Sequence, residues 1–243
     1  MTATPSPAHV PAAASGTAVG RVGPARTTMA VVTLLGPVLF VLAFLFEPYG
    51  LDADDKAMVR GIAEHTGQMK ADLWIWLAAS LLLTAAILIV GVYTMARSPK
   101  LGLAGTLLFG GAVILINGTP STDAVTLAGL DKGIDQPVLV TLQKGIESLP
   151  QLNVAIIGFI AGHVIGSILL GVALLRSRAV PVWAAWAVIV AMPLNVAGWI
   201  TGVEAVAVVG FAALAVGFGA VGLSIARNGT GWVRATTETG ASG

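Results

Sequence analysis

The residues best able to do chemistry in this sequence are His163, Asn195 and Glu204, because each lies in a long apolar run. Ionisable groups are costly inside a membrane, so those that occur there are candidates for function. A buried imidazole also needs a hydrogen-bonding partner, and Asn195 is the nearest one in depth along the predicted helices. We therefore predict that the three side chains converge on one ligand-binding pocket that opens to the outer side of the membrane.

A purely structural explanation stays open for each charged member of this set. His163 could be a neutral imidazole that bonds to a neighbouring helix or to Ser167, one turn further on. Glu204 could be a solvated residue in the first turn of a helix, where the helix dipole favours a carboxylate. Such structural roles are the commoner ones, so the predicted pocket requires a direct test.

No motif of a known catalytic or metal centre accompanies these residues. The chain has no cysteine, which excludes disulfides and thiolate chemistry. A G-x-G-x-x-G match at 217–222 lies inside an apolar run rather than after a strand, which indicates a helix-packing face and not a dinucleotide site. Asp52, Asp54 and Asp55 lack the spacing of a calcium-binding loop and indicate a solvated acidic loop. We expect no catalytic residue, no metal site and no cofactor.

The elements that hold the candidate residues are predicted to be transmembrane helices. The chain has 243 residues, of which 56% are hydrophobic and only 10% charged. Soluble domains carry about 25% charged residues, and a net charge of +1 leaves no basic excess for nucleic acid. A helix needs about 20 apolar residues to cross a bilayer. Six runs approach or reach this length: Met29–Phe46, Leu73–Met95, Leu101–Asn117, Asn153–Leu175, Pro181–Ile200 and Val203–Ala226. The predicted fold is an all-α polytopic membrane bundle of six transmembrane helices, spanning 28–226.

The distribution of lysine and arginine predicts the orientation of this bundle. With the N-terminus in the cytoplasm, most Lys and Arg residues lie on the inner side, and Arg follows the second, fourth and sixth runs directly. All acidic residues except Glu238 then lie outside. We predict that both termini are cytoplasmic and that residues 1–27 and 227–243 are disordered tails, because their composition is polar or rich in Ala, Pro and Gly.

Two long outer loops, Glu47–Asp72 and Gly118–Leu152, interrupt the otherwise short connections. Each contains a stretch with the spacing of an amphipathic helix, at Asp54–His65 and at Asp135–Leu149. The hairpins that follow these stretches resemble each other, which suggests a weak direct repeat of 54–117 in 135–195. Such repeats are common in transporters, although apolar hairpins with basic turns also resemble each other by composition alone.

Gly158, Gly162 and Gly166 form a doubled G-x-x-x-G pattern in the fourth apolar run. Small residues at this spacing allow another helix backbone to approach closely. The partner helix could belong to the same chain, to a second copy or to another membrane protein. Beyond the lipid bilayer, these are the partners that the sequence suggests, and nucleic acid is not among them.

Several short stretches resemble those of a known group of proteins. They are Glu64-His65 before the Trp-flanked second run, Gly162-His163-Val164-Ile165-Gly166, Arg176-Ser177-Arg178 and Pro181-Val182-Trp183-Ala184. Over 28–226 the chain resembles small multi-pass membrane proteins of high-GC actinobacteria whose domain has no known function. This resemblance implies a bacterial plasma-membrane protein, and it supplies no catalytic residue.

Three hypotheses for the function follow, in decreasing order of support. The first is a non-enzymatic membrane protein that binds a small molecule or lipid, or that serves as a subunit of a larger assembly. The second is a small secondary transporter, which the repeat favours. The third is a membrane-embedded enzyme that modifies an isoprenoid or lipid with Glu204 as its acid, although the Asp clusters that bind diphosphate–magnesium are absent from the sequence.

Overall fold

The computed structural model describes residues 23–228, and this part of the chain contains helices and no strand. The helices are α1 (Pro24–Phe46), α2 (Asp55–Glu64), α3 (Thr66–Met95), α4 (Pro99–Asn117), α5 (Thr122–Asp131), α6 (Gln136–Glu147), α7 (Pro150–Ser177), α8 (Val182–Thr201) and α9 (Glu204–Asn228). The predicted all-α fold is therefore confirmed. The predicted tails 1–27 and 227–243 lie almost wholly outside the described residues, apart from the first turn of α1 and the last residues of α9.

Six helical segments in the described range are long and apolar enough to cross a membrane, and they correspond to the six predicted runs. The protein is thus a multi-pass membrane protein. Four helices begin before their apolar runs, namely α1, α3, α4 and α7, and the difference is largest for α3, which begins at Thr66. The backbone hydrogen bonds of a helix continue beyond the apolar stretch, so hydropathy locates the membrane segment better than it locates the helix ends.

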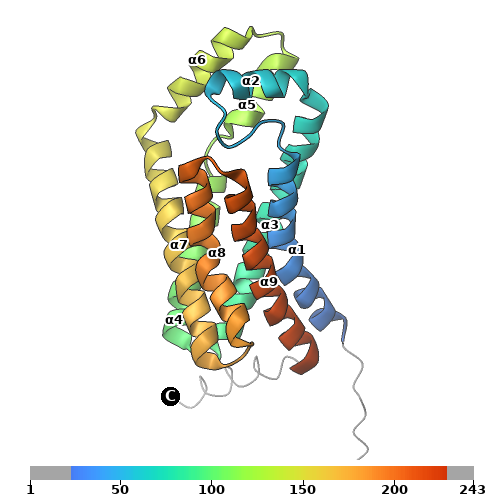
Figure 1. Cartoon of the computed structure of the whole chain (residues 1–243), viewed down its shortest axis with the longest axis vertical. Helices are drawn as coiled ribbons and strands as arrows, with labels where there is room; N and C mark the ends of the chain where they lie inside the picture. The colour runs from blue at the N-terminus through green and yellow to red at the C-terminus, as the bar shows by residue number, and fades with distance from the viewer. Residues whose placement is uncertain (1–22, 229–243) are drawn as a thin grey trace, which may run out of the picture.

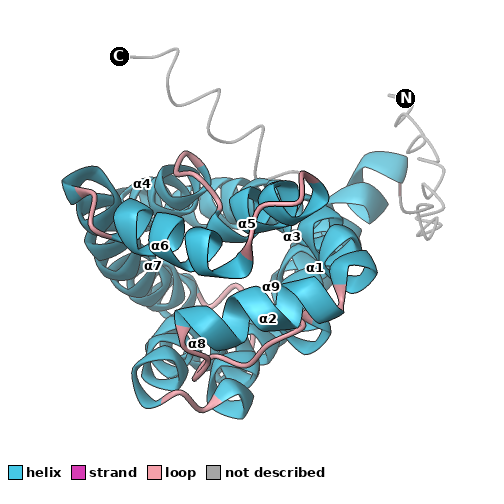
Figure 2. Cartoon of the chain, turned by 90° about the horizontal axis from the view of Figure 1, so that it is seen from above, coloured by secondary structure: helices cyan, strands magenta, loops and turns pink. Residues whose placement is uncertain are grey.

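The six long helices are arranged as a closed ring in the order α1, α3, α4, α7, α8 and α9, with α9 packed against α1 again. Figures 1 and 2 show this bundle from the side and from above. Large side chains fill its centre: Phe109 of α4 lies 6.4 Å from Phe218 of α9, ring centroid to ring centroid, although these helices are not neighbours in the ring. The bundle therefore has a packed apolar core.

Three short helices, α2, α5 and α6, lie together over one end of the bundle, which we call the capped end (Figure 1). Ile62 of α2, Leu127 of α5 and Met69 of α3 form a small apolar core between these helices. The amphipathic helices predicted in the two long loops are confirmed as α2 and α6. Helix α5 was not predicted. It has a mixed composition, but the Ser121 hydroxyl caps it by accepting a hydrogen bond from the Ala124 N–H at 3.2 Å.

The other end of the bundle, which we call the uncapped end, comprises the starts of α1, α4 and α8 and the ends of α3, α7 and α9. The two ends differ in charge. Within the described range, every Asp and Glu lies in the capped half, whereas Arg26, Arg97, Lys100, Arg176, Arg178 and Arg227 lie at the uncapped end.

The order of one short and two long helices occurs twice, as α2–α3–α4 and as α6–α7–α8. The hairpins share a close contact: a Cβ on Gly91 would meet Thr106, and a Cβ on Gly171 would lie 2.9 Å from the carbonyl oxygen of Ala185. The predicted superposition of 54–117 on 135–195 stays a prediction.

Candidate binding site at the capped end

His163 lies in α7 and is 2% exposed. Its Nδ1–H donates to the carbonyl of Phe159, and its ring stacks on the Phe159 ring at a centroid distance of 4.2 Å. Ser167 is not its partner, because the Ser167 hydroxyl donates to the carbonyl of Val164 at 3.0 Å. The Nε2 atom of His163 is buried and has no hydrogen-bonding partner among the described residues.

Asn195 and Glu204 lie on adjoining helices. The buried Asn195 side chain of α8 donates from Nδ2 to the carbonyl oxygen of Ala207 in α9, at 3.3 Å. The two backbones are close here, since a Cβ on Gly210 would lie 2.6 Å from the Asn195 nitrogen. Glu204 begins α9, one turn before Ala207, and is half-buried.

No hydrogen bond in the described part of the chain joins any two of His163, Asn195 and Glu204. Asn195 and Glu204 share the α8–α9 interface, whereas His163 is held within its own helix. Their convergence on one pocket stays a prediction.

The glycine pattern on α7 faces α4 of the same chain. A Cβ on Gly158 would lie 2.8 Å from the Leu115 side chain, and one on Gly162 would lie 2.9 Å from the Leu108 carbonyl oxygen. On Gly166 it would lie 2.5 Å from the Phe109 backbone nitrogen. These short distances show that the absence of side chains brings α7 and α4 together.

A group of acids at the capped end forms a second candidate site, which we call the carboxylate cluster: Glu47, Asp72, Asp123 and Glu204, with Tyr49. They come from the end of α1, the α1–α2 loop, α3, α5 and the start of α9. The Tyr49 hydroxyl donates to Oδ1 of Asp123 at 2.6 Å. Asp72 is fully buried, and neither of its carboxylate oxygens has a hydrogen-bonding partner among the described residues.

The proximity of these acids changes the proton affinity of Glu47. Burial raises the pKa of Glu47 to about 8; the Tyr49 hydroxyl opposes this shift, and the charges of Asp123, Asp72 and Glu204 add to it. Burial, together with the negative charges of Asp123 and Glu47, also raises the pKa of Tyr49. Glu47 is thus mostly protonated at pH 7, and the cluster holds protons that isolated carboxyl groups would release.

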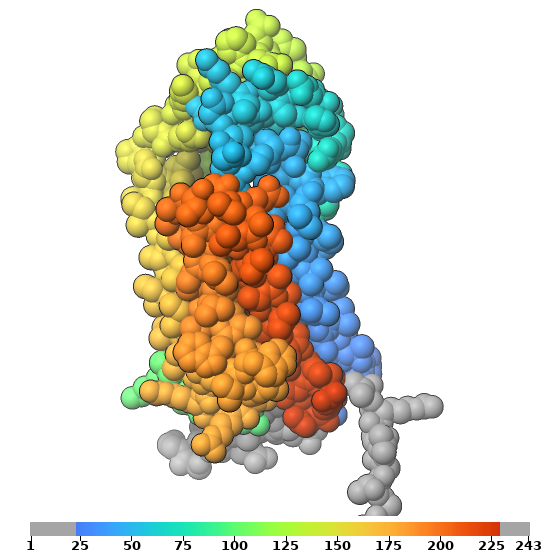
Figure 3. Space-filling view, viewed as in Figure 1, coloured from blue at the N-terminus to red at the C-terminus, as the bar shows by residue number. Residues whose placement is uncertain are grey.

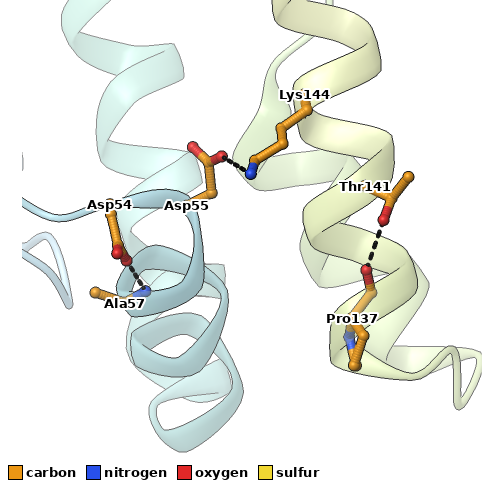
Figure 4. A network of polar contacts seen from close by, with 6 residues as sticks. All are labelled: Asp54, Asp55, Ala57, Pro137, Thr141 and Lys144. Atoms are coloured by element: carbon orange, nitrogen blue, oxygen red, sulfur yellow. Dashed lines mark hydrogen bonds and ion pairs between the residues drawn. The ribbon is translucent and has the colours of Figure 1, made fainter.

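Basic side chains do not neutralise the carboxylate cluster. The two ion pairs in the described range are Lys70 with Asp131, at 3.0 Å, and Lys144 with Asp55, at 3.9 Å, and both lie outside it. Figure 4 shows the second pair, which joins α2 to α6. No group of three or more His, Cys, Asp or Glu residues in this range is placed to hold a metal ion.

Aromatic rings lie next to the cluster on the side of the bundle core. Trp76 is one turn after Asp72 on α3, and its ring packs edge-on against Phe40 at 4.9 Å and Phe44 at 5.7 Å. Phe44 also meets Trp199 at 5.8 Å, which extends the aromatic group to the end of α8. The site therefore combines negative charge with aromatic surface.

Residues 28–225 match the model of a protein family described as a domain of unknown function, DUF4386. No curated protein and no solved structure matches the chain.

Proposed function

The chain belongs to the DUF4386 family, and from its geometry we propose a non-enzymatic membrane protein that binds a small organic ammonium ion at the carboxylate cluster. One observation carries this proposal. The Asp72 carboxylate is fully buried beside the Trp76 indole, inside a group of acids that has no basic partner among the described residues.

The charge of the cluster favours a cationic ligand. Burial of a carboxylate without a partner is costly, so the group must take up a proton or pair with a cation. An ammonium group donates hydrogen bonds to carboxylates and is also attracted to the face of an indole ring, and Trp76 adjoins Asp72. Binding of the ligand would displace protons from the cluster, so we expect affinity to increase with pH.

The α1–α2 loop covers the cluster and offers a route for the ligand. A Cβ on Gly50 would lie 2.9 Å from Oδ1 of Asp52 and 3.9 Å from Oε2 of Glu204, and Asp52 lies against Gly202 of the α8–α9 turn. In Figure 3 the surface is recessed where the α8–α9 turn meets the cap. Movement of this loop would expose the acids.

We place the capped end outside the cell. The basic residues that directly flank the membrane-spanning helices at the uncapped end, with no acid beside them in the described range, support this orientation, because such residues favour the cytoplasmic side. The plasma membrane of a bacterium is the proposed location, so the ligand would arrive from the extracytoplasmic side.

The decisive experiment measures ammonium binding to the purified full chain. Tryptophan fluorescence is titrated with tetramethylammonium and with ethylammonium chloride, with sodium chloride as the ionic-strength control. We expect saturable binding that weakens about tenfold or more in Asp72→Asn, since one charge-assisted contact contributes at least about 1.4 kcal/mol. The unfolding temperature of Asp72→Asn is measured alongside, so that a loss of binding is distinguished from a loss of folding.

Asp131→Asn is the matched control, because it removes one carboxylate at the same end from an exposed ion pair. Its affinity should match that of the unmodified protein. If neither ammonium salt changes the fluorescence beyond sodium chloride, or if both variants lose affinity equally, the proposal is wrong.

Transport is the second candidate function, and the unpartnered Nε2 of His163 favours it. Gly171 of α7 packs against Ala185 and Ile189 of the antiparallel helix α8. On α7, His163 lies about two turns from Gly171, toward the capped end. The same two turns along α8 lead from Ala185 and Ile189 toward Asn195, so His163 and Asn195 lie at similar depths. Polar groups would then extend from Glu204 into the bundle. Ammonium uptake by proteoliposomes under a pH gradient, and its loss in His163→Leu, would distinguish transport from binding alone.

The lipid-modifying enzyme receives less support. Its proposed acid, Glu204, lies in the first turn of α9, and the Asp clusters that bind diphosphate–magnesium are absent from the sequence.

A further inference from the structure

The uncapped end carries a groove between the start of α8 and the end of α9. Its volume is about 420 Å³, and its lining changes from polar to apolar along α9. Arg227 and Asn228 line the end of the groove, whereas Leu223, Gly219 and Val216 continue it for about three turns toward the middle of the bundle. A groove of this kind suits a ligand with a polar head and an apolar chain.

A second, smaller groove of about 270 Å³ lies between α9 and α1. Gly219 and Leu223 belong to both grooves, so the apolar surface continues around α9. The missing side chain of Gly219 keeps this surface open, because the only close neighbour of a Cβ there would be Cδ1 of Leu34, at 3.2 Å. Val216 and Leu223 are about half exposed, at 51% and 48%.

The charges around the grooves are positive, and none of them forms an ion pair with another described residue. Arg26 in the first turn of α1 precedes Thr27 of the smaller groove, and Arg227 lines the larger one. Neither arginine forms an ion pair in the described range, where the acids all lie in the capped half. Trp183, at the rim of the larger groove, is 59% exposed. An indole ring in this position is typical of the headgroup level of a bilayer.

We infer that an anionic phospholipid binds at this end, with its phosphate next to Arg227 and one acyl chain along Leu223, Gly219 and Val216. The apolar lining and its exposure favour a lipid over a free anion, which would gain nothing from an apolar track. The unpaired arginines favour an anionic headgroup over a zwitterionic one. The bound lipid would fill the space between α1, α8 and α9 at the membrane surface.

Native mass spectrometry of the full chain tests this site. The protein is exchanged into detergent and offered phosphatidylglycerol or phosphatidylcholine at equal concentrations. We expect preferential retention of phosphatidylglycerol and a loss of about fivefold in its affinity for Arg227→Gln. Arg176→Gln is the matched control, because it removes the same charge from an exposed position at the same end, outside both grooves. Its affinity should be unchanged.

A second variant tests the acyl track. Gly219→Leu places a side chain in the groove, and we expect it to weaken the retention of both lipids by about fivefold. The unfolding temperature of each variant is measured alongside, and if Gly219→Leu does not fold, Arg227→Gln decides alone.

Three outcomes would overturn the inference. Equal losses of phosphatidylglycerol affinity in Arg227→Gln and Arg176→Gln would show that the positive charge of this end attracts the lipid without a defined site. Competition by glycerol 3-phosphate as strong as that by phosphatidylglycerol would show a site for free anions. A dimer that survives the removal of lipid and disappears in Gly219→Leu would show that this surface binds a second copy of the chain.

Discussion

The two ends of this membrane bundle differ in what covers them and in the charged residues they carry. At the capped end, acids from four segments of the chain lie together, and the cap is held by a small apolar core, helix caps and two ion pairs. At the uncapped end no short helices cover the bundle in the described range, and the charged residues there are five arginines and a lysine. Glycines bring helices into backbone contact toward both ends, as Gly222 does with Ala30 and Gly198 with Ala207, so the difference lies in the cap and its acids, which allow the capped end to change its charge.

The strongest test of this comparison is to determine which end of the bundle faces the outside of the cell. The chain has no cysteine, so single cysteines report their own position. Lys132→Cys, exposed at the capped end, should react with a membrane-impermeant maleimide in intact cells, and Lys100→Cys, exposed at the uncapped end, should react only after permeabilisation. Labelling of Lys100→Cys in sealed cells would reverse the proposed orientation.

The rigidity of the uncapped end can be tested at Gly222. A Cβ there would lie 2.9 Å from the Ala30 carbonyl oxygen and 3.0 Å from the Ala30 Cα, and backbone cannot move aside as a side chain can. Gly222→Leu should destabilise the protein by about 3 kcal/mol or more. Thermal unfolding in detergent measures the loss. Gly111→Leu is the matched control, since nothing lies within 4 Å of a Cβ on Gly111, and an unchanged Gly222→Leu would contradict the packing.

The sequence predicts those features of the two ends that depend on local residue patterns. The six spans follow from apolar length, and α2 and α6 follow from the spacing of apolar residues in a polar loop. Glu47 and Asp72 directly flank apolar runs in the sequence, a signal that could have marked them as candidates. Nothing local shows that they meet Asp123, because α5 reaches them only through packing of the cap. The lone polar residues His163 and Asn195 were easier to notice than a cluster assembled from distant loops.

The carboxyl groups at the capped end predict that the stability of the protein depends on pH. The pKa of Glu47 is about 8 in the folded protein and 4.5 when unperturbed. Because the folded state holds this proton more tightly, its contribution to stability is greatest below pH 4.5, falls as the pH rises, and is lost above about pH 8. The unfolding temperature should therefore decrease from pH 5 to pH 8, by an amount equivalent to about 1–3 kcal/mol.

Glu47→Gln should flatten this pH profile and raise stability at pH 8, since glutamine stays neutral. Glu64→Gln, an exposed residue of α2, is the control and should retain the slope of the unmodified protein. A slope that Glu47→Gln leaves intact would show that other groups dominate the pH dependence.

The smallest expected effect concerns a contact between two helices of the cap, α2 and α6. Lys144 of α6 and Asp55 of α2 form the ion pair of Figure 4, at 3.9 Å, and the lysine side chain is 65% exposed. Exposed pairs contribute about 0.2–1 kcal/mol because water screens the charges. Lys144→Gln should therefore change the unfolding temperature very little at low ionic strength, and not at all in about 1 M salt. A loss larger than about 1 kcal/mol, or one that persists in high salt, would show that this contact holds α2 and α6 together more than their packing does. A small loss would show that packing against α2 and α5 holds α6 in the cap.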